Sequence, residues 1–170
     1  MNTFFEEFKT TLDAVAREIP ELPRQEVILT RLHFFLFRSL NEDMNQTLSG
    51  FGLNTTSMLA LVILYANPGP INPSRLSYGM ISSRTNITRL IDEWVNKGWV
   101  QKEACTHDRR KVYVSLTESG RQLIKRALPA QWARIKSIWG VLTPGEAALL
   151  EELLHRVWQR ILAIDLPNLR

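Results

Sequence analysis

The side chains best suited to chemistry lie in the middle of the chain, where one predicted helix has an apolar face and a polar face. The apolar residues recur at intervals of three and four and are Ile87, Leu90, Ile91 and Trp94. Thr85, Arg89, Asp92 and Asn96 lie opposite, and Asn86 and Thr88 flank them, so the outward N-terminal half offers hydroxyl, amide and guanidinium groups on Thr85, Asn86, Thr88 and Arg89. Arginine can pair with guanine, asparagine with adenine, and threonine with a base or a thymine methyl group. This pattern predicts a helix at 83–97 that reads base edges in the major groove of DNA.

The start of this helix is suited to a phosphate group. Ser83 and the first backbone amides lie at the positive end of the helix dipole. Arg84 projects nearer to the apolar flank, so it is better placed for a phosphate than for a base. The alternative is that all these residues form only the solvated face of an amphipathic helix.

A second basic segment follows the helix. Residues 100–104 and 112–116 alternate in polarity, which predicts a β-hairpin, or wing, with a charged turn at 105–111. Consecutive cations occupy this turn, at Arg109, Arg110 and Lys111. Arginine is favoured by the negative potential of a narrow minor groove, and Asp108 is expected to orient a neighbouring arginine. The alternative is an ordinary polar turn, but two DNA-facing elements in succession favour DNA.

The elements that position these side chains are mostly helical. Helical patterns cover residues 4–19, 24–49, 54–66, 73–79, 84–97, 117–139 and 144–162, with a kink or break expected at Pro129. A helix–turn–helix followed by a hairpin is a winged helix. The helices on either side are not part of a winged helix, and pairing with a second chain would explain why they are present. We predict a mainly α fold with N-terminal dimerisation helices (1–52), a winged helix-turn-helix domain (53–116) and C-terminal dimerisation helices (117–170).

Charge is concentrated in the predicted DNA-binding segment. The 170-residue chain has a formal net charge of +4. Residues 1–72 carry 5 basic and 8 acidic side chains, residues 73–126 carry 11 and 5, and residues 127–170 carry 5 and 4. The middle segment is therefore the basic one, which favours a polyanionic partner such as double-stranded DNA.

Several other classes of protein are disfavoured by the sequence. A single cysteine excludes an internal disulfide and an all-cysteine zinc site. The three histidines are scattered, and no HExxH, GxSxG or Walker motif occurs, so we expect no enzymatic activity, cofactor or metal. The longest apolar stretch, 58–66, is about half of the ~20 residues that cross a bilayer, and MNTFFEEFK does not resemble a signal peptide. We therefore expect a cytoplasmic protein without a membrane partner.

Two strings of residues carry a family resemblance. SSRTNITRLIDEWVNKGWV at 82–100 and DRRKVYVSLTESG at 108–120 resemble the multiple-antibiotic-resistance-regulator (MarR) family of bacterial transcription factors. The first string is especially similar to the multidrug-efflux repressor branch of that family. The helix order agrees from about residue 24 to residue 165, whereas the helix at 4–19 precedes the usual family core.

The resemblance implies a homodimer whose N- and C-terminal helices intertwine and whose two winged helices bind a pseudo-palindrome. It also implies repression of efflux, stress or resistance genes, relieved by a small phenolic or lipophilic effector. Cys105 lies beside the wing rather than in the helix 24–49, which argues against thiol sensing. The alternative is a winged helix used for protein contacts without DNA, but the cationic and hydroxylated face at 83–89 disfavours it.

Overall fold

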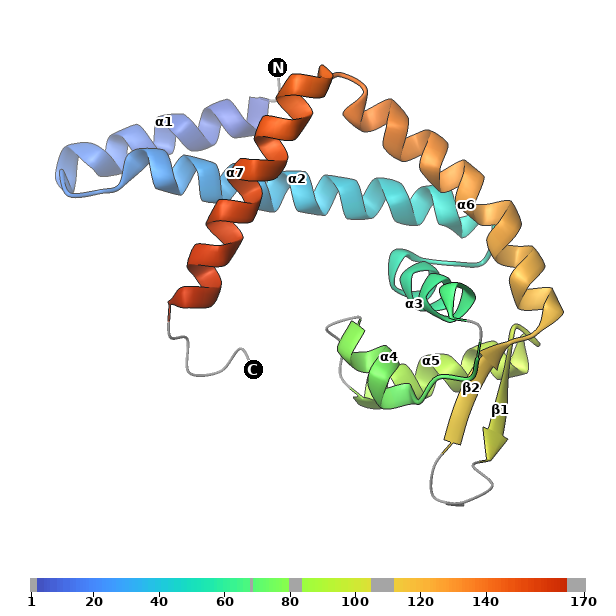
Figure 1. Ribbon diagram of the computed structural model, residues 1–170. Coiled ribbons are helices and arrows are strands. Elements are labelled where there is room, and N and C mark those ends of the chain that lie inside the picture. Colours follow the sequence, from blue (N-terminus) through green and yellow to red (C-terminus); the bar gives the residue numbers. More distant parts are fainter. Residues whose placement is uncertain (1–2, 68, 80–83, 105–111, 165–170) are drawn as a thin grey trace. The chain divides into compact units, whose positions relative to one another are not determined.

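The computed structural model describes residues 3–67, 69–79, 84–104 and 112–164. Figure 1 shows helices and one small hairpin, which confirms the predicted mainly α winged-helix fold. The elements are α1 (Thr3–Glu18), α2 (Arg24–Ser49), α3 (Thr55–Ala66), α4 (Pro73–Gly79), α5 (Arg84–Asn96), β1 (Val100–Ala104), β2 (Val112–Leu116), α6 (Glu118–Trp139) and α7 (Pro144–Ala163). They form two compact units, Met1–Thr55 and Thr56–Arg170. In the described part of the chain, no helix is both long and apolar enough to span a membrane.

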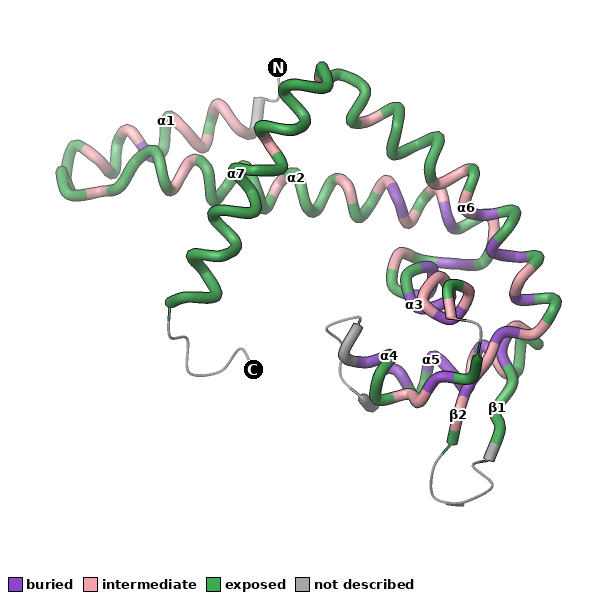
Figure 2. Tube along the Cα trace, in the orientation of Figure 1, coloured by how far each residue is buried: buried purple, intermediate pink, exposed green. Residues whose placement is uncertain are grey.

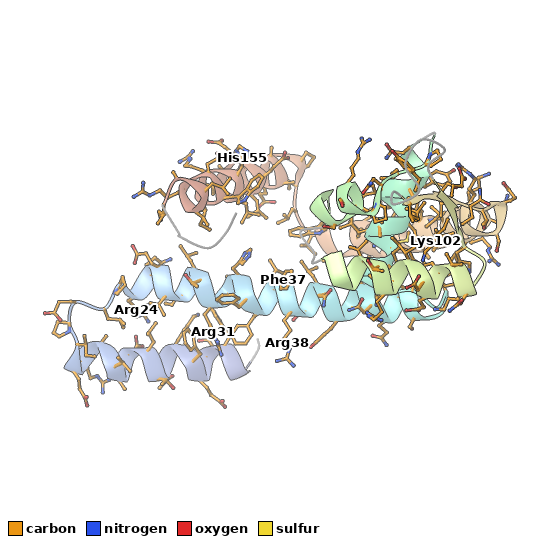
Figure 3. The ribbon with its side chains drawn as sticks, turned by 90° about the horizontal axis from the view of Figure 1, so that it is seen from below. Arg24, Arg31, Phe37, Arg38, Lys102 and His155 are labelled. Atoms are coloured by element: carbon orange, nitrogen blue, oxygen red, sulfur yellow. The ribbon has the colours of Figure 1, made fainter. Side chains whose placement is uncertain are left out.

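The first unit is an antiparallel pair of helices, α1 and α2. Near their open end the Phe5 and Phe35 rings meet edge to face, 6.0 Å apart. The Arg31 guanidinium lies 4.8 Å from the Phe35 ring, and Figure 3 shows Arg31 pointing from α2 toward α1. Near the connecting turn, Arg24 Nε donates to Asp13 Oδ1 at 2.7 Å. Aromatic, cation–π and ionic contacts therefore join α1 to the helix that follows it.

The second unit has its core around α3 and α5. Its fully buried apolar side chains come from helices on both sides of the hairpin and from β2, and they include Leu61, Leu76, Ile87, Ile91, Trp94, Val114 and Ile124. The hairpin is antiparallel, with Val100 opposite Leu116 and Ala104 opposite Val112. Ile71, just before α4, forms a β-bridge to Val114 on the other edge of β2. The wing is thus hydrogen-bonded to the chain segment that enters the helix–turn–helix.

The junction between the hairpin and α6 depends on Thr117. Its hydroxyl donates to the Gly98 carbonyl at 2.6 Å and accepts from the Gly120 amide at 3.1 Å, which caps α6. Gly98 has a φ of 69°, so it turns the chain out of α5 in the left-handed region that favours glycine. The backbone of Gly120 lies so close to Trp99 that an added Cβ would be 2.1 Å from the Trp99 carbonyl oxygen.

Helices α6 and α7 differ from expectation at one point. The sequence predicts a kink or break at Pro129; the break does not occur, since α6 runs from Glu118 to Trp139 with Pro129 inside it. Proline removes the donor for the carbonyl four residues earlier, at Lys125, and Lys125 is exposed, so water can serve that carbonyl. Helix α7 begins with a capping box: the Glu146 amide donates to Thr143 Oγ1, and Glu146 Oε2 accepts from the Thr143 amide at 2.8 Å.

The apolar side of α7 is open to solvent in the single chain. Helix α7 has no buried residue, as Figure 2 shows along its length. Its large exposed apolar residues are Leu149, Leu153, Leu154, Val157, Trp158, Ile161 and Leu162. Together these residues form an exposed apolar stripe along α7.

Replacement of Gly120 tests the junction. Gly120→Ala should lower the free energy of unfolding by about 1–3 kcal/mol, because the added methyl group meets backbone rather than a movable side chain. Chemical denaturation measures this loss. The matched control is Gly145→Ala in α7, where nothing lies within 4 Å of the new Cβ, so stability should not fall. Equal stabilities for the two variants would contradict this description of the junction.

Candidate nucleic-acid interface

The burial of its apolar face fixes the orientation of α5 about its own axis. The four residues predicted for that face are all buried, with exposed fractions of at most 4%: Ile87, Leu90, Ile91 and Trp94. Full burial of such side chains contributes on the order of 1.5–3 kcal/mol each. Rotating the helix would bring these residues into water, so their burial decides which side of α5 faces outward.

Thr88 and Arg89 are the predicted base-reading residues whose side chains the structure describes. Both are exposed on α5, and the Arg89 side chain is 68% exposed. Arg84, Thr85 and Asn86 form the first turn of α5. Ser83, at the predicted helix start, lies outside the described residues, and so do Arg109, Arg110 and Lys111 of the predicted wing tip. The structure therefore brings Thr88 and Arg89 to one outward surface.

A row of charges runs along α5 from Arg89, and its other members, Glu93 and Lys97, are not among the site residues predicted from the sequence. Lys97 Nζ donates to Glu93 Oε1 at 2.7 Å, and the other carboxylate oxygen, Oε2, lies 3.9 Å from Arg89 Nη1. The hydrogen bond from Lys97, together with the positive charges of Lys97 and Arg89, holds the pKa of Glu93 below its ordinary value. Since residues four apart are neighbours on a helix, the spacing 89, 93 and 97 is the signal that could have revealed this row.

A second ion pair joins the helix to the hairpin. Lys102 on β1, labelled in Figure 3, pairs with Asp92 on α5. The two side chains are 40% and 54% exposed, so the pair contributes at most about 1 kcal/mol. The ion pair matters for geometry rather than for stability, because it links the outer surface of α5 to strand β1.

The two strands of the hairpin form a regularly paired ladder. Pairing continues to Ala104 and Val112, the last described residues before and after the turn. Glu103 accepts hydrogen bonds from Ser115 Oγ and Gln101 Nε2, each at 3.1 Å, so side chains also cross-link the strands. The two strands that follow α5 are therefore joined by backbone and side-chain hydrogen bonds.

The interior of this unit contains one unusual polar atom. Trp94 is fully buried, and its Nε1 has no hydrogen-bond partner in the described part of the chain. A second aromatic residue, Tyr65 on α3, lies beneath the Arg121 guanidinium at 5.9 Å. Among the described residues, no group of three or more His, Cys, Asp or Glu side chains could hold a metal ion.

Comparison with known proteins agrees with this architecture. The MarR family model matches residues 53–112, which include the helix–turn–helix and most of the hairpin. The transcriptional repressor MprA of Escherichia coli K12 is 33% identical over 162 residues, which cover 95% of this chain and 92% of MprA. The matched relatives are transcriptional regulators rather than enzymes.

Solved structures give the same result. A mutant of MarR from E. coli, crystallised with operator DNA, has a TM-score of 0.71 and 25% identity over 81% of this chain and 98% of its own. AbsC of Streptomyces coelicolor, a MarR-family regulator, has a TM-score of 0.76, covers 84% of this chain and 97% of its own, and at 24% identity shows the fold alone. MarR-family regulators bind DNA as dimers. This chain, similar to MprA along nearly its whole length and built as a winged helix, belongs to the MarR family and is a DNA-binding transcriptional regulator.

Proposed function

We propose that the protein is a ligand-responsive repressor of efflux, stress or resistance genes, acting as a homodimer on a pseudo-palindromic operator. Its similarity to the transcriptional repressor MprA over 95% of the chain supports repression, and the resemblance of residues 82–100 to the multidrug-efflux repressor branch suggests the class of genes. The observation that carries the DNA-binding geometry is the outward placement of Thr88 and Arg89 on a helix whose other side is buried. A regulator of this kind works beside the chromosome, so we assign it to the cytoplasm.

The DNA-binding roles follow the chemistry of each side chain. Helix 83–97 enters the major groove, and the wing, 105–111, reaches the minor groove. Ser83 and Arg84 bind phosphate at the helix start. The base-reading residues are Thr85, Asn86, Thr88 and Arg89, and the minor-groove residues are Arg109, Arg110 and Lys111. Together these residues form the DNA-binding site of the domain that we assign to 53–116.

The flanking segments, 1–52 and 117–170, form the homodimer. The exposed stripe of α7 supports this proposal, since a contiguous apolar surface in a small soluble protein marks an interaction site. The family resemblance also suggests a small phenolic or lipophilic effector that relieves repression.

Substitution of Arg89 tests base reading. Arg89→Ala should weaken binding to the cognate site by about 1–3 kcal/mol and relax the preference at one base position, because alanine cannot donate the paired hydrogen bonds to guanine. Gel shifts on the cognate site and a scrambled duplex measure both effects. Equal losses of affinity on the two duplexes would show that Arg89 binds phosphate only.

Substitution of Arg110 tests the wing. Arg110→Ala should weaken operator binding and reduce the slope of log K against log salt by about 0.9 for each phosphate that is no longer neutralised. Circular dichroism should be unchanged, since the turn belongs to a surface hairpin. If the folded variant binds the operator as tightly as the wild type, the minor-groove assignment is wrong.

Substitution of Val157 tests the dimer. Val157 lies in the exposed stripe of α7 and is 60% exposed. Val157→Glu should raise the dimer dissociation constant at least about tenfold, because the interface would bury an unpaired carboxylate. Gln159→Glu is the matched control, since it adds the same charge on the opposite side of α7. Sedimentation velocity should show monomer for the first variant alone, and dimers for both would exclude this stripe from the interface.

A further inference from the structure

We propose that Glu93 is a specificity-determining residue that positions Arg89 for base contact and disfavours its contact with phosphate. The inference rests on the base-reading role proposed for Arg89. It assigns a function to an acidic side chain beside a surface that binds a polyanion, where a carboxylate would otherwise only weaken binding.

The first argument is the geometry of the Glu93 carboxylate. Its two oxygens face different cations: Oε1 accepts from Lys97 Nζ at 2.7 Å, and Oε2 lies 3.9 Å from Arg89 Nη1. The Lys97 ammonium lies 4.6 Å from the centre of the Trp99 ring, which restrains it from the other side. Glu93 is thus held from its C-terminal side and offers its second oxygen to Arg89.

The second argument is the direction of the side chains on α5. Helical side chains tilt toward the N-terminus, so Glu93 lies over the turn that carries Arg89. The Nη1 atom of Arg89 lies 3.9 Å from this carboxylate, and a guanidinium group is a planar fork that can make bidentate contact with guanine. Because both side chains are largely exposed, at 68% and 43%, the ion pair is weak enough to let Arg89 adjust when a base is presented.

The third argument is electrostatic discrimination between the two kinds of DNA contact. A phosphate that approaches Arg89 from the Glu93 side meets a second negative charge. The acceptor atoms on a guanine edge carry only partial charges and lie in a fixed direction. The Glu93 carboxylate therefore repels them less than it repels a phosphate. Glu93 therefore lowers the affinity for arbitrary DNA more than the affinity for the cognate site.

The test compares two duplexes in binding to the full-length protein. One duplex is selected by the wild-type protein from a random-sequence library, and the other is a scrambled version of it. Glu93→Gln should tighten binding to the scrambled duplex about 3–10-fold, with a smaller change on the selected duplex, so the specificity ratio falls. The salt slope on the scrambled duplex should become steeper by up to about 0.9, as Arg89 neutralises one more phosphate.

Glu103→Gln is the matched control for charge alone. Glu103 lies on β1 of the same unit, and its carboxylate accepts from Ser115 and Gln101 rather than from an arginine. Its removal should change binding to both duplexes by the same factor. An identical pattern for Glu93→Gln would overturn the inference and make Glu93 an ordinary surface charge.

A double-mutant cycle with Arg89→Ala separates this inference from the proposed function. In the Arg89→Ala background, Glu93→Gln should no longer alter the specificity ratio. A persistent change in that background would overturn the inference, because Glu93 would then act without Arg89. If Arg89→Ala itself leaves the ratio unchanged, the base-reading role of Arg89 fails first, and the role of Glu93 fails with it.

Discussion

The burial of one side of α5 is the constraint on which the proposed DNA-binding surface depends. Ile87, Ile91 and Trp94 are almost completely enclosed, so the helix cannot turn about its axis without exposing them. Thr88 and Arg89 face outward as a consequence of that burial. Core packing thus supplies the orientation of the surface, and the polar residues are left to supply its chemistry.

The connection from this helix to the wing depends on a few backbone positions. Gly98 ends α5 in the left-handed region, the Thr117 amide donates to the Trp99 carbonyl at 3.0 Å, and Gly120 packs against the same carbonyl. The residues that end α5, close the hairpin and start α6 therefore share one small volume. Because these contacts involve backbone, they do not relax as side chains would, and the hairpin keeps its direction relative to α5.

Much of this arrangement could be predicted from the sequence because it depends on local patterns. The three- and four-residue spacing in α5, the capping threonines and the alternation in the strands all act over short distances. Of the kink or break expected at Pro129, the break does not occur, because solvent can serve the carbonyl that proline leaves without a donor. The pairing of Asp92 with Lys102 could not be predicted, since it depends on how the turn at Gly98 aims the hairpin. The charges on α5 have a predictable spacing, but which of them pair depends on side-chain rotamers that the sequence does not specify.

The bridge between Ile71 and Val114 has a further consequence for the hairpin. It covers the outer edge of β2 with two backbone hydrogen bonds, of 2.8 and 2.9 Å, so β1 is left as the edge strand of this small sheet. An uncovered edge strand can recruit strands from other chains and begin aggregation. In β1 the central positions are Gln101, Lys102 and Glu103, all exposed, and strand addition would have to desolvate two charged side chains. The same lysine that pairs with Asp92 of α5 therefore helps to prevent strand addition at the one exposed sheet edge within the described residues.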